Sequence, residues 1–175
     1  KKLVAMQTTL YEMRDRIRSG EIYAFSSNPV LYRDMSRRVI ETLQQFSPEV
    51  EQYSIDEAFL GLHGFTRLDL TEYGETIRAT VGQWTGIPVT VGIARTKTLA
   101  KLAAHVAKRT PDLNGVLNLE TVSDMDAVLA AIDVGAVWGI GRNLKTQLKT
   151  MGITTALQLK QADESLIKKK FGVLG

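Results

Sequence analysis

Two neighbouring carboxylates, Asp56 and Glu57, stand inside an otherwise apolar stretch of the 175-residue chain. Carboxylate oxygens are the ligands that hard cations such as Mg²⁺ prefer, and a pair of such cations can clamp an in-line phosphoryl displacement. Consecutive residues of a regular strand point to opposite faces, so both side chains reach one cation only where the backbone bends. The dipeptide therefore predicts either part of a metal site or a solvated turn without a ligand.

The residue composition excludes other kinds of metal site. The chain has no Cys and two His, and these residues, His63 and His105, lie far apart. Disulfides and thiolate or imidazole clusters are therefore excluded, and we expect both His to be structural or surface residues. No apolar run approaches the roughly 20 residues that cross a bilayer. We accordingly expect no membrane partner, no secretion and a cytoplasmic location.

Basic residues gather in two segments without Asp or Glu, residues 76–111 and 134–162, although the net charge is only +3. Such segments suit a polyanion, but a solvated basic face gives the same pattern. Lys108, near the end of an expected helix, is a candidate point charge for a triphosphate. Lys97 and Lys101, earlier on that helix, either line the approach of a nucleic-acid backbone or face water.

Gly139 and Gly141 flank Ile140 in a turn that leads into an expected helix at Arg142. Glycines in a tight turn let main-chain N–H groups approach a ligand closely, and a helix N-terminus presents further unpaired N–H groups. Arg142 and Lys145 would add electrostatic attraction. The segment predicts a contact with a phosphate backbone, with a plain turn as the alternative.

Hydrophobic spacing predicts the elements that hold these residues. The strands 50–54 and 58–62 form a hairpin with the acidic pair at its bend. The fold class is α+β, with helices packed on a mixed sheet and only helices after a boundary near residues 133–136. The other expected elements are helices at residues 3–17, 29–46 (with Asn28 as N-cap), 69–84 (with Asp69 as N-cap), 96–108 and 122–132, and strands at 21–25, 88–94 and 115–119.

The chain resembles the Y-family of translesion DNA polymerases, most closely the bacterial UmuC type of the SOS response. The resemblance covers nearly all of residues 21–165, and its motifs follow the order and spacing of the family. The matching segments are Phe25-Ser26-Ser27-Asn28 with Leu31-Tyr32, Tyr53 to Phe59, Val89 to Ala103, and Val137 to Gly141.

The resemblance implies roles for individual residues. Asp56 and Glu57 would be two of three palm carboxylates that bind two Mg²⁺ ions. Lys108, with Tyr32, would contact the incoming deoxynucleoside triphosphate. The turn of Gly139, Ile140 and Gly141, with Arg142 and Lys145, would hold primer-template DNA.

The resemblance also implies a division into domains: the end of the fingers at residues 1–20, a palm at 21–133, and a partial thumb with a helix-hairpin-helix at 134–175. The strand that carries the third metal-binding Asp in the family has no counterpart in this sequence. We therefore expect a fragment that is inactive alone, from a complete protein with an SOS accessory subunit and a sliding clamp as partners. The alternative is a non-catalytic DNA-binding module in which Asp56 and Glu57 only form a turn.

Overall fold

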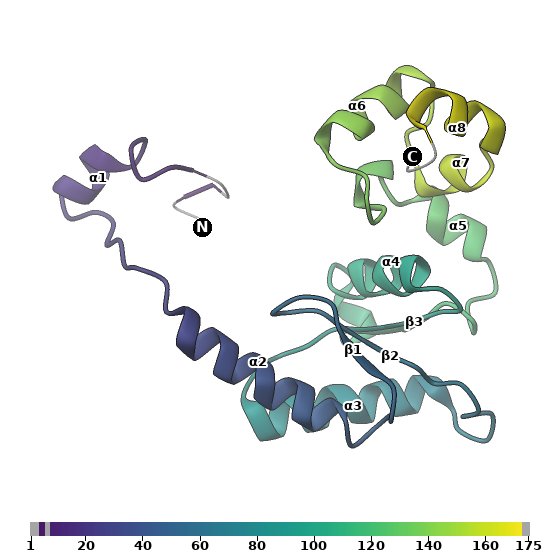
Figure 1. Cartoon of the computed structure of the whole chain (residues 1–175), viewed down its shortest axis with the longest axis horizontal. Coiled ribbons are helices and arrows are strands. Elements are labelled where there is room, and N and C mark those ends of the chain that lie inside the picture. Colours follow the sequence, from purple (N-terminus) through teal and green to yellow (C-terminus); the bar gives the residue numbers. More distant parts are fainter. Residues whose placement is uncertain (1–3, 6–7, 173–175) are drawn as a thin grey trace. The chain divides into compact units, whose positions relative to one another are not determined.

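Helices and short strands are interleaved as far as β4, and helices follow, in a computed structural model that describes residues 4–5 and 8–172 (Figure 1). The predicted α+β class is confirmed. The helices are α1 (Arg14–Arg18), α2 (Pro29–Leu43), α3 (Leu70–Thr85), α4 (Lys97–Ala107), α5 (Met125–Ala130), α6 (Arg142–Thr150), α7 (Ala156–Lys160) and α8 (Glu164–Phe171). The strands are β1 (Val50–Gln52), β2 (Ala58–Leu60), β3 (Val91–Ile93) and β4 (Val116–Asn118), and the 3-10 helices are η1 (Pro111–Leu113) and η2 (Val134–Ala136).

The chain divides into two compact units, residues 1–34 and 35–175. Helix α2 begins in the first unit and ends in the second. Its start matches the prediction, because Pro29 is the first helical residue and the Asn28 side chain accepts a hydrogen bond from the Leu31 N–H at 3.0 Å. Such an N-cap satisfies one of the N–H groups that a helix start leaves without a partner.

Two predictions for the first unit are wrong. The helix expected over residues 3–17 forms only as α1, with Leu3 and Met6 outside the described residues, and residues 21–25 form no strand. Phe25 is 89% exposed. A short amphipathic helix is marginal in water unless its apolar face is buried, and a strand needs a partner for its backbone groups. Leu10 of the expected apolar face is 71% exposed, and no strand of the described residues pairs with residues 21–25.

The strands form two separate pairs. β1 and β2 are antiparallel, with Val50 opposite Leu60, and β3 and β4 are parallel, with Val91 opposite Val116. No ladder joins the pairs within the described residues, so the single mixed sheet of the prediction is divided in two. The parallel pair follows from its connection, because a crossover that contains α4 links β3 to β4.

Helix α4 lies very close to one face of the parallel pair (Figure 1). Gly92 in β3 makes this approach possible, since a Cβ atom there would overlap the carbonyl oxygen of Ala100 and the amide nitrogen of Ala104. Ala103 of α4 is 0% exposed and packs with Leu117 of β4, whereas Leu102, which is 3% exposed, packs on another side of the helix with Leu129 of α5. Burial of a leucine side chain contributes about 1.5–3 kcal/mol, so the two contacts together fix α4.

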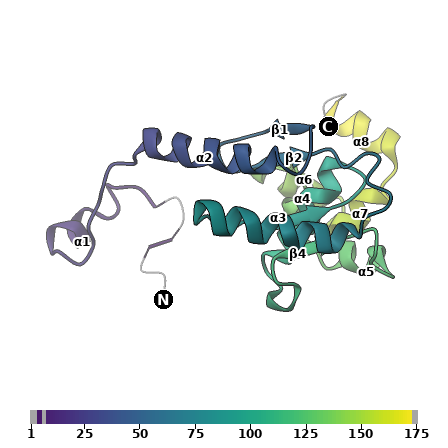
Figure 2. The same cartoon turned by 90° about the horizontal axis from the view of Figure 1, so that it is seen from below.

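Helix α3 covers the other face of the parallel pair and runs beside the second half of α2 (Figure 2). Ile77 and Val81 of α3 are buried with Leu43 of α2, and side chains from both strand pairs surround them. Asp69 caps α3, as predicted, by accepting hydrogen bonds from two N–H groups of the first turn. The same helix layer thus supports both pairs of strands.

The region from η2 to α8 has its own small core. Val134, Leu148 and Ile153 are 0%, 2% and 8% exposed. Thr155 and Gln158 form a reciprocal capping box at the start of α7. As predicted, the described residues form only helices here, apart from one isolated bridge between Asp133 and Thr155. Throughout residues 4–5 and 8–172, no helix has the length and apolar content that crossing a membrane requires.

Candidate functional site

The predicted bend between β1 and β2 is confirmed, and it carries the acidic pair. The Glu57 carbonyl oxygen accepts hydrogen bonds from the N–H groups of Tyr53 and Ser54, both at 3.0 Å. The Ser54 hydroxyl donates to Asp56 Oδ1 at 2.7 Å. Both carboxylates are exposed on this irregular backbone. The strict alternation of a strand is therefore broken where the two acidic residues follow each other.

Two lysines of α4 contact this hairpin. Lys101 Nζ lies 2.8 Å from Glu57 Oε1, and Lys97 forms an ion pair with Glu51 of β1. The two lysines are four residues apart, so they project from the same side of the helix. The sequence predicted that these lysines either face DNA or are solvated. In the structure, both form ion pairs with carboxylates of the hairpin.

Two aromatic rings, those of Tyr53 and Trp138, contact the Lys101 side chain, and a third ring packs beside them. Lys101 Nζ lies 5.0 Å from the ring centroid of Tyr53 and 5.2 Å from that of Trp138, within the range of cation–π attraction. Trp138 Nε1 donates a hydrogen bond to the Tyr53 hydroxyl at 3.1 Å. The Phe59 ring lies 5.7 Å from the Trp138 ring. The sequence analysis missed this cluster, because its members are up to 85 residues apart.

The carboxylates at the bend have the donor chemistry of a magnesium site. Both side chains are exposed and adjacent, and each offers carboxylate oxygens as ligands. This suits Mg²⁺, which keeps water or phosphate oxygens as its other ligands. Within the described part of the chain, however, no group of three or more His, Cys, Asp or Glu side chains comes together. Asp56 and Glu57 therefore supply part of the ligand set that a magnesium site needs, and other groups must supply the rest.

Lys108, one of the two candidate nucleotide contacts, lies apart from the bend. Lys108 is the exposed C-cap residue of α4, and seven residues of helix place it about 10 Å along the axis from Lys101. No contact joins Lys108 to either carboxylate in the described residues. Tyr32 lies in the first turn of α2, in the unit of residues 1–34, and is 52% exposed. Its side chain is therefore accessible and not part of a core.

The expected turn precedes α6. Gly139 has a φ of +91°, a conformation that L side chains rarely adopt, and Gly141 is the N-cap residue of α6. No side chain caps this helix start. Ile140 packs against the core formed by Val134 and its neighbours, whereas Arg142 is exposed. The N–H groups of Ile140 and Gly141 donate within the turn, to the carbonyl oxygens of Val137 and Gly139. The uncapped start of α6 and the Arg142 guanidinium are therefore the groups that this segment offers at the surface.

Asp133 changes the electrostatics of this segment. Its carboxylate accepts contacts from Lys145 at 2.8 Å and Lys149 at 3.0 Å, and from the Gly135 N–H at 2.8 Å. Hydrogen bonds from the two ammonium groups, followed by that of Gly135, hold the pKa of Asp133 well below its usual value. The acid-free segment of the sequence is thus partly neutralised by a residue just outside it, which reduces the charge that Lys145 offers to a phosphate.

A model of the impB/mucB/samB family matches residues 1–105, which is more than half of the chain. The chain belongs to this family. It is 46% identical over 166 residues to Protein UmuC of Salmonella typhimurium, a match that covers 94% of this chain and 39% of UmuC. It is 34% identical over 147 residues to DNA polymerase IV 2 of Bacillus subtilis, covering 82% of this chain and 35% of that protein.

The chain thus spans less than half the length of these family relatives. Among solved structures, it is similar to an insertion ternary complex of Dbh DNA polymerase, with a TM-score of 0.76 and 24% sequence identity. That alignment covers 98% of this chain and 48% of the Dbh chain. The α+β arrangement of helices and short strands is therefore the fold of part of a Y-family polymerase.

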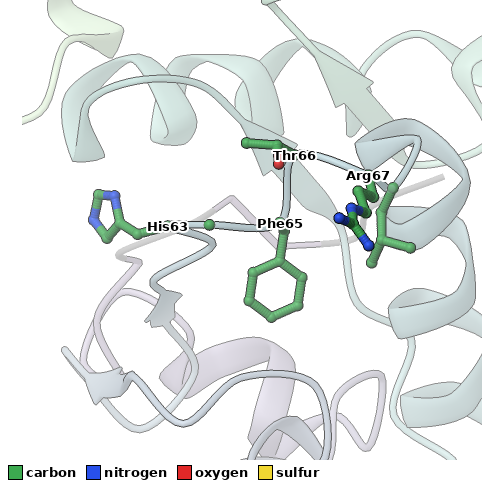
Figure 3. A pocket seen from close by; sticks show the side chains of 6 residues that line it. His63, Phe65, Thr66 and Arg67 are labelled. Carbon is green, nitrogen blue, oxygen red and sulfur yellow. The ribbon is translucent and has the colours of Figure 1, made fainter.

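A shallow hollow elsewhere on the surface does not belong to the candidate site. It lies in the loop between β2 and α3 and is lined by residues 63–68, including His63 and Arg67 (Figure 3). Phe65 of this loop packs its ring 5.7 Å from that of Tyr73. None of the sequence-predicted site residues lines it, and His63 is an exposed loop residue, as expected.

Proposed function

We propose that this chain is the palm-bearing part of a Y-family translesion DNA polymerase, a nucleotidyltransferase of SOS-type damage tolerance in the cytoplasm. The family membership supports the polymerase assignment. The single observation that carries the catalytic assignment is the irregular hairpin bend, which exposes Asp56 and Glu57 side by side. A turn that served only to reverse the chain would not require two adjacent carboxylates.

In the complete protein, Asp56 and Glu57 would hold Mg²⁺ together with a further carboxylate. When bound, such ions would supply Lewis-acid stabilisation of the charge on the triphosphate and would activate the primer hydroxyl. The role of the chain's own residues is positional. The bend sets the two carboxylates next to each other, and α4, fixed by its close approach to β3, delimits one side of the site.

Lys108 contacts the phosphates of the incoming deoxynucleoside triphosphate in this proposal, with Tyr32 as a second contact. Lys108 is exposed at the end of α4, so its ammonium is available to a polyanion. A lysine acts on phosphate as a point charge and needs no fixed geometry. The SOS accessory subunit and the sliding clamp belong to the same proposal as partners of the complete protein.

We assign residues 1–20 to the end of the fingers, 21–133 to the palm and 134–175 to a partial thumb with a helix-hairpin-helix. The thumb holds primer-template DNA at the turn of Gly139, Ile140 and Gly141. The uncapped start of α6, the positive φ of Gly139 and the exposed Arg142 support this role, because helix N-termini bind phosphate without reading bases.

The test of the catalytic assignment is primer extension by the full-length protein with Mg²⁺. Asp56→Asn keeps the size of the side chain and its capacity to accept the Ser54 hydrogen bond but removes the charge. We expect extension to fall roughly a hundredfold or more, because metal ligands act as a unit. Glu75→Gln, on the exposed surface of α3, is the matched control and should leave extension unchanged.

Equal activity of Asp56→Asn and the parent protein would refute the metal role and favour the non-catalytic DNA-binding module. Among the described residues, two carboxylates come together at the bend, and no group of three or more metal-binding side chains forms. We therefore expect the 175-residue chain by itself to extend no primer under conditions in which the full-length protein is active.

A further inference from the structure

Lys101 lies where three segments far apart in the sequence meet. Its ammonium contacts Glu57 of the hairpin bend at 2.8 Å and lies over the rings of Tyr53 and Trp138. The Lys101 side chain is 23% exposed, against 46% for Glu57. Lys101 is therefore more enclosed than the carboxylate it contacts, which is unusual for a residue whose charge prefers water.

The aromatic rings hold Lys101 independently of Glu57. Tyr53 and Trp138 pack edge to face with their centroids 5.0 Å apart, and the hydrogen bond from Trp138 Nε1 fixes the Tyr53 hydroxyl. A lysine normally samples many rotamers. Between two mutually fixed rings, this freedom is restricted before any carboxylate is engaged.

The contact with Glu57 uses one of its two carboxylate oxygens. Lys101 engages Oε1, and in the described residues no hydrogen bond is made to Oε2. A carboxylate held through one oxygen presents the other in a restricted direction. Partners that orient a ligand in this way typically account for a 10–100-fold difference in metal affinity.

We propose that Lys101 is a positioning residue for Glu57, and that Tyr53 and Trp138 hold Lys101 in place for this task. The inference rests on the proposed function, in which Glu57 binds a cation. It extends that function in one respect: the orientation of a palm carboxylate depends on Trp138, a residue of the helical region that begins after residue 133.

A substitution that removes the charge of Lys101 distinguishes positioning from simple electrostatics, because the two roles predict opposite changes in metal affinity. An ammonium beside a cation site repels the cation, so its removal should tighten metal binding if charge alone matters. If Lys101 positions Glu57, its removal should weaken metal binding although a like charge has gone.

The experiment measures the affinity of the full-length protein for Mn²⁺ from the electron paramagnetic resonance signal of the free ion. For Lys101→Met we expect an affinity about tenfold lower. Lys101→Arg keeps the charge and the donors and should recover most of the parent affinity. An unchanged or higher affinity in Lys101→Met would overturn the proposal.

Trp138→Leu tests the part played by the rings, because it leaves every charge in place. We expect a lower Mn²⁺ affinity, and no further loss when Trp138→Leu is combined with Lys101→Met. Trp84→Leu is the matched control: this tryptophan is 62% exposed on α3, and its replacement should leave the affinity unchanged. Additive losses in the double variant would show that the rings do not act through Lys101.

Thermal unfolding of each variant reports whether it folds. If Trp138→Leu fails to fold, Tyr53→Phe replaces it as the test, since it removes only the hydroxyl that accepts the Trp138 hydrogen bond. A lower Mn²⁺ affinity in Tyr53→Phe is then expected, and an unchanged affinity would count against the rings.

Failure of this inference and failure of the proposed function give different results. If Asp56→Asn and Glu57→Gln leave Mn²⁺ binding intact, the metal role itself is wrong. If both of these substitutions weaken Mn²⁺ binding while Lys101→Met does not, the metal role stands and only the positioning role of Lys101 is wrong.

Discussion

The hairpin bend and the start of the helical region both combine carboxylates with lysines, but in opposite proportions. At the bend, two exposed carboxylates meet one lysine, and Lys101 engages only Glu57. At residue 133, a single carboxylate meets two lysines, Lys145 and Lys149. The first cluster keeps an excess of negative charge and suits a cation, whereas the second keeps an excess of positive charge and suits a phosphate.

The two clusters also differ in how they are held. Residues of the bend are brought to Lys101 by the packing of α4 against β3, which depends on the absence of a side chain at Gly92. Asp133 and its two lysines lie within one short helical region and are held by exposed ion pairs. The bend should therefore be sensitive to changes in the core, and the second cluster to charge, salt and pH.

The largest effect is expected for Gly92→Ala. The new methyl group would overlap backbone atoms of α4, which cannot move aside as a side chain can, so we expect a loss of about 3 kcal/mol or more in the free energy of unfolding. Chemical denaturation measures this loss. Gly82→Ala in α3 is the control, because its Cβ meets nothing within 4 Å and alanine favours a helix by roughly 0.5–1 kcal/mol. Equal stabilities would show that α4 is not fixed by this approach.

Asp133→Asn should strengthen DNA binding by the helical region. Asparagine still accepts the Gly135 hydrogen bond but releases Lys145 and Lys149, so we expect roughly tenfold tighter binding at low salt and a salt dependence steeper by about two phosphate contacts. Fluorescence anisotropy over a salt series measures both quantities. Asp126→Asn makes the same change in net charge beside Lys160 of α7. If it has the same effect, the gain reflects overall charge and not the cluster.

Arg142→Ala should act in the opposite direction and more weakly. Removal of one guanidinium beside the turn should reduce the salt slope of DNA binding by about one. Arg67→Ala, on the exposed loop between β2 and α3, is the comparison variant and should leave the slope unchanged. Binding that does not depend on salt in the parent chain would contradict the phosphate contact altogether.

The smallest effect is the pH dependence of Asp133. Its pKa is lowered in the folded chain, so its ion pairs contribute stability above the unfolded pKa of about 3.9 and lose this contribution as the pH falls below that value. We therefore expect Asp133→Asn to show a weaker decline in stability than the parent chain below about pH 4. Thermal unfolding between neutral and acidic pH measures the difference, and parallel curves would contradict the assignment.

Local patterns in the sequence predicted much of the fold. The N-caps Asn28 and Asp69, the bend with Asp56 and Glu57 and the glycine turn before α6 all form as expected. Each of these features involves residues within a few positions of one another. Their conformations follow from capping, steric preference and hydrophobic spacing, which depend on neighbouring residues and not on the rest of the chain.

The expected helix over residues 3–17 shows the limit of such patterns. Its apolar spacing was sound, but an amphipathic stripe forms a stable helix only against a partner surface. The charge pattern failed for a similar reason. Residues 134–162 contain no acid in the sequence, yet Asp133 contacts two lysines of α6, Lys145 and Lys149. A linear count of charges cannot identify contacts made in space.

The sequence by itself determined where the carboxylates, the glycine turn and the basic residues lie along the chain, because these depend on residue type and local backbone preference. Only the tertiary structure decided which of them meet. Glu57 and Lys101 are 44 residues apart, and Tyr53 and Trp138 are 85 apart. These residues are brought together by the packing of α4 on β3 and of the helical region beside the hairpin. Many weak contacts act together in this packing.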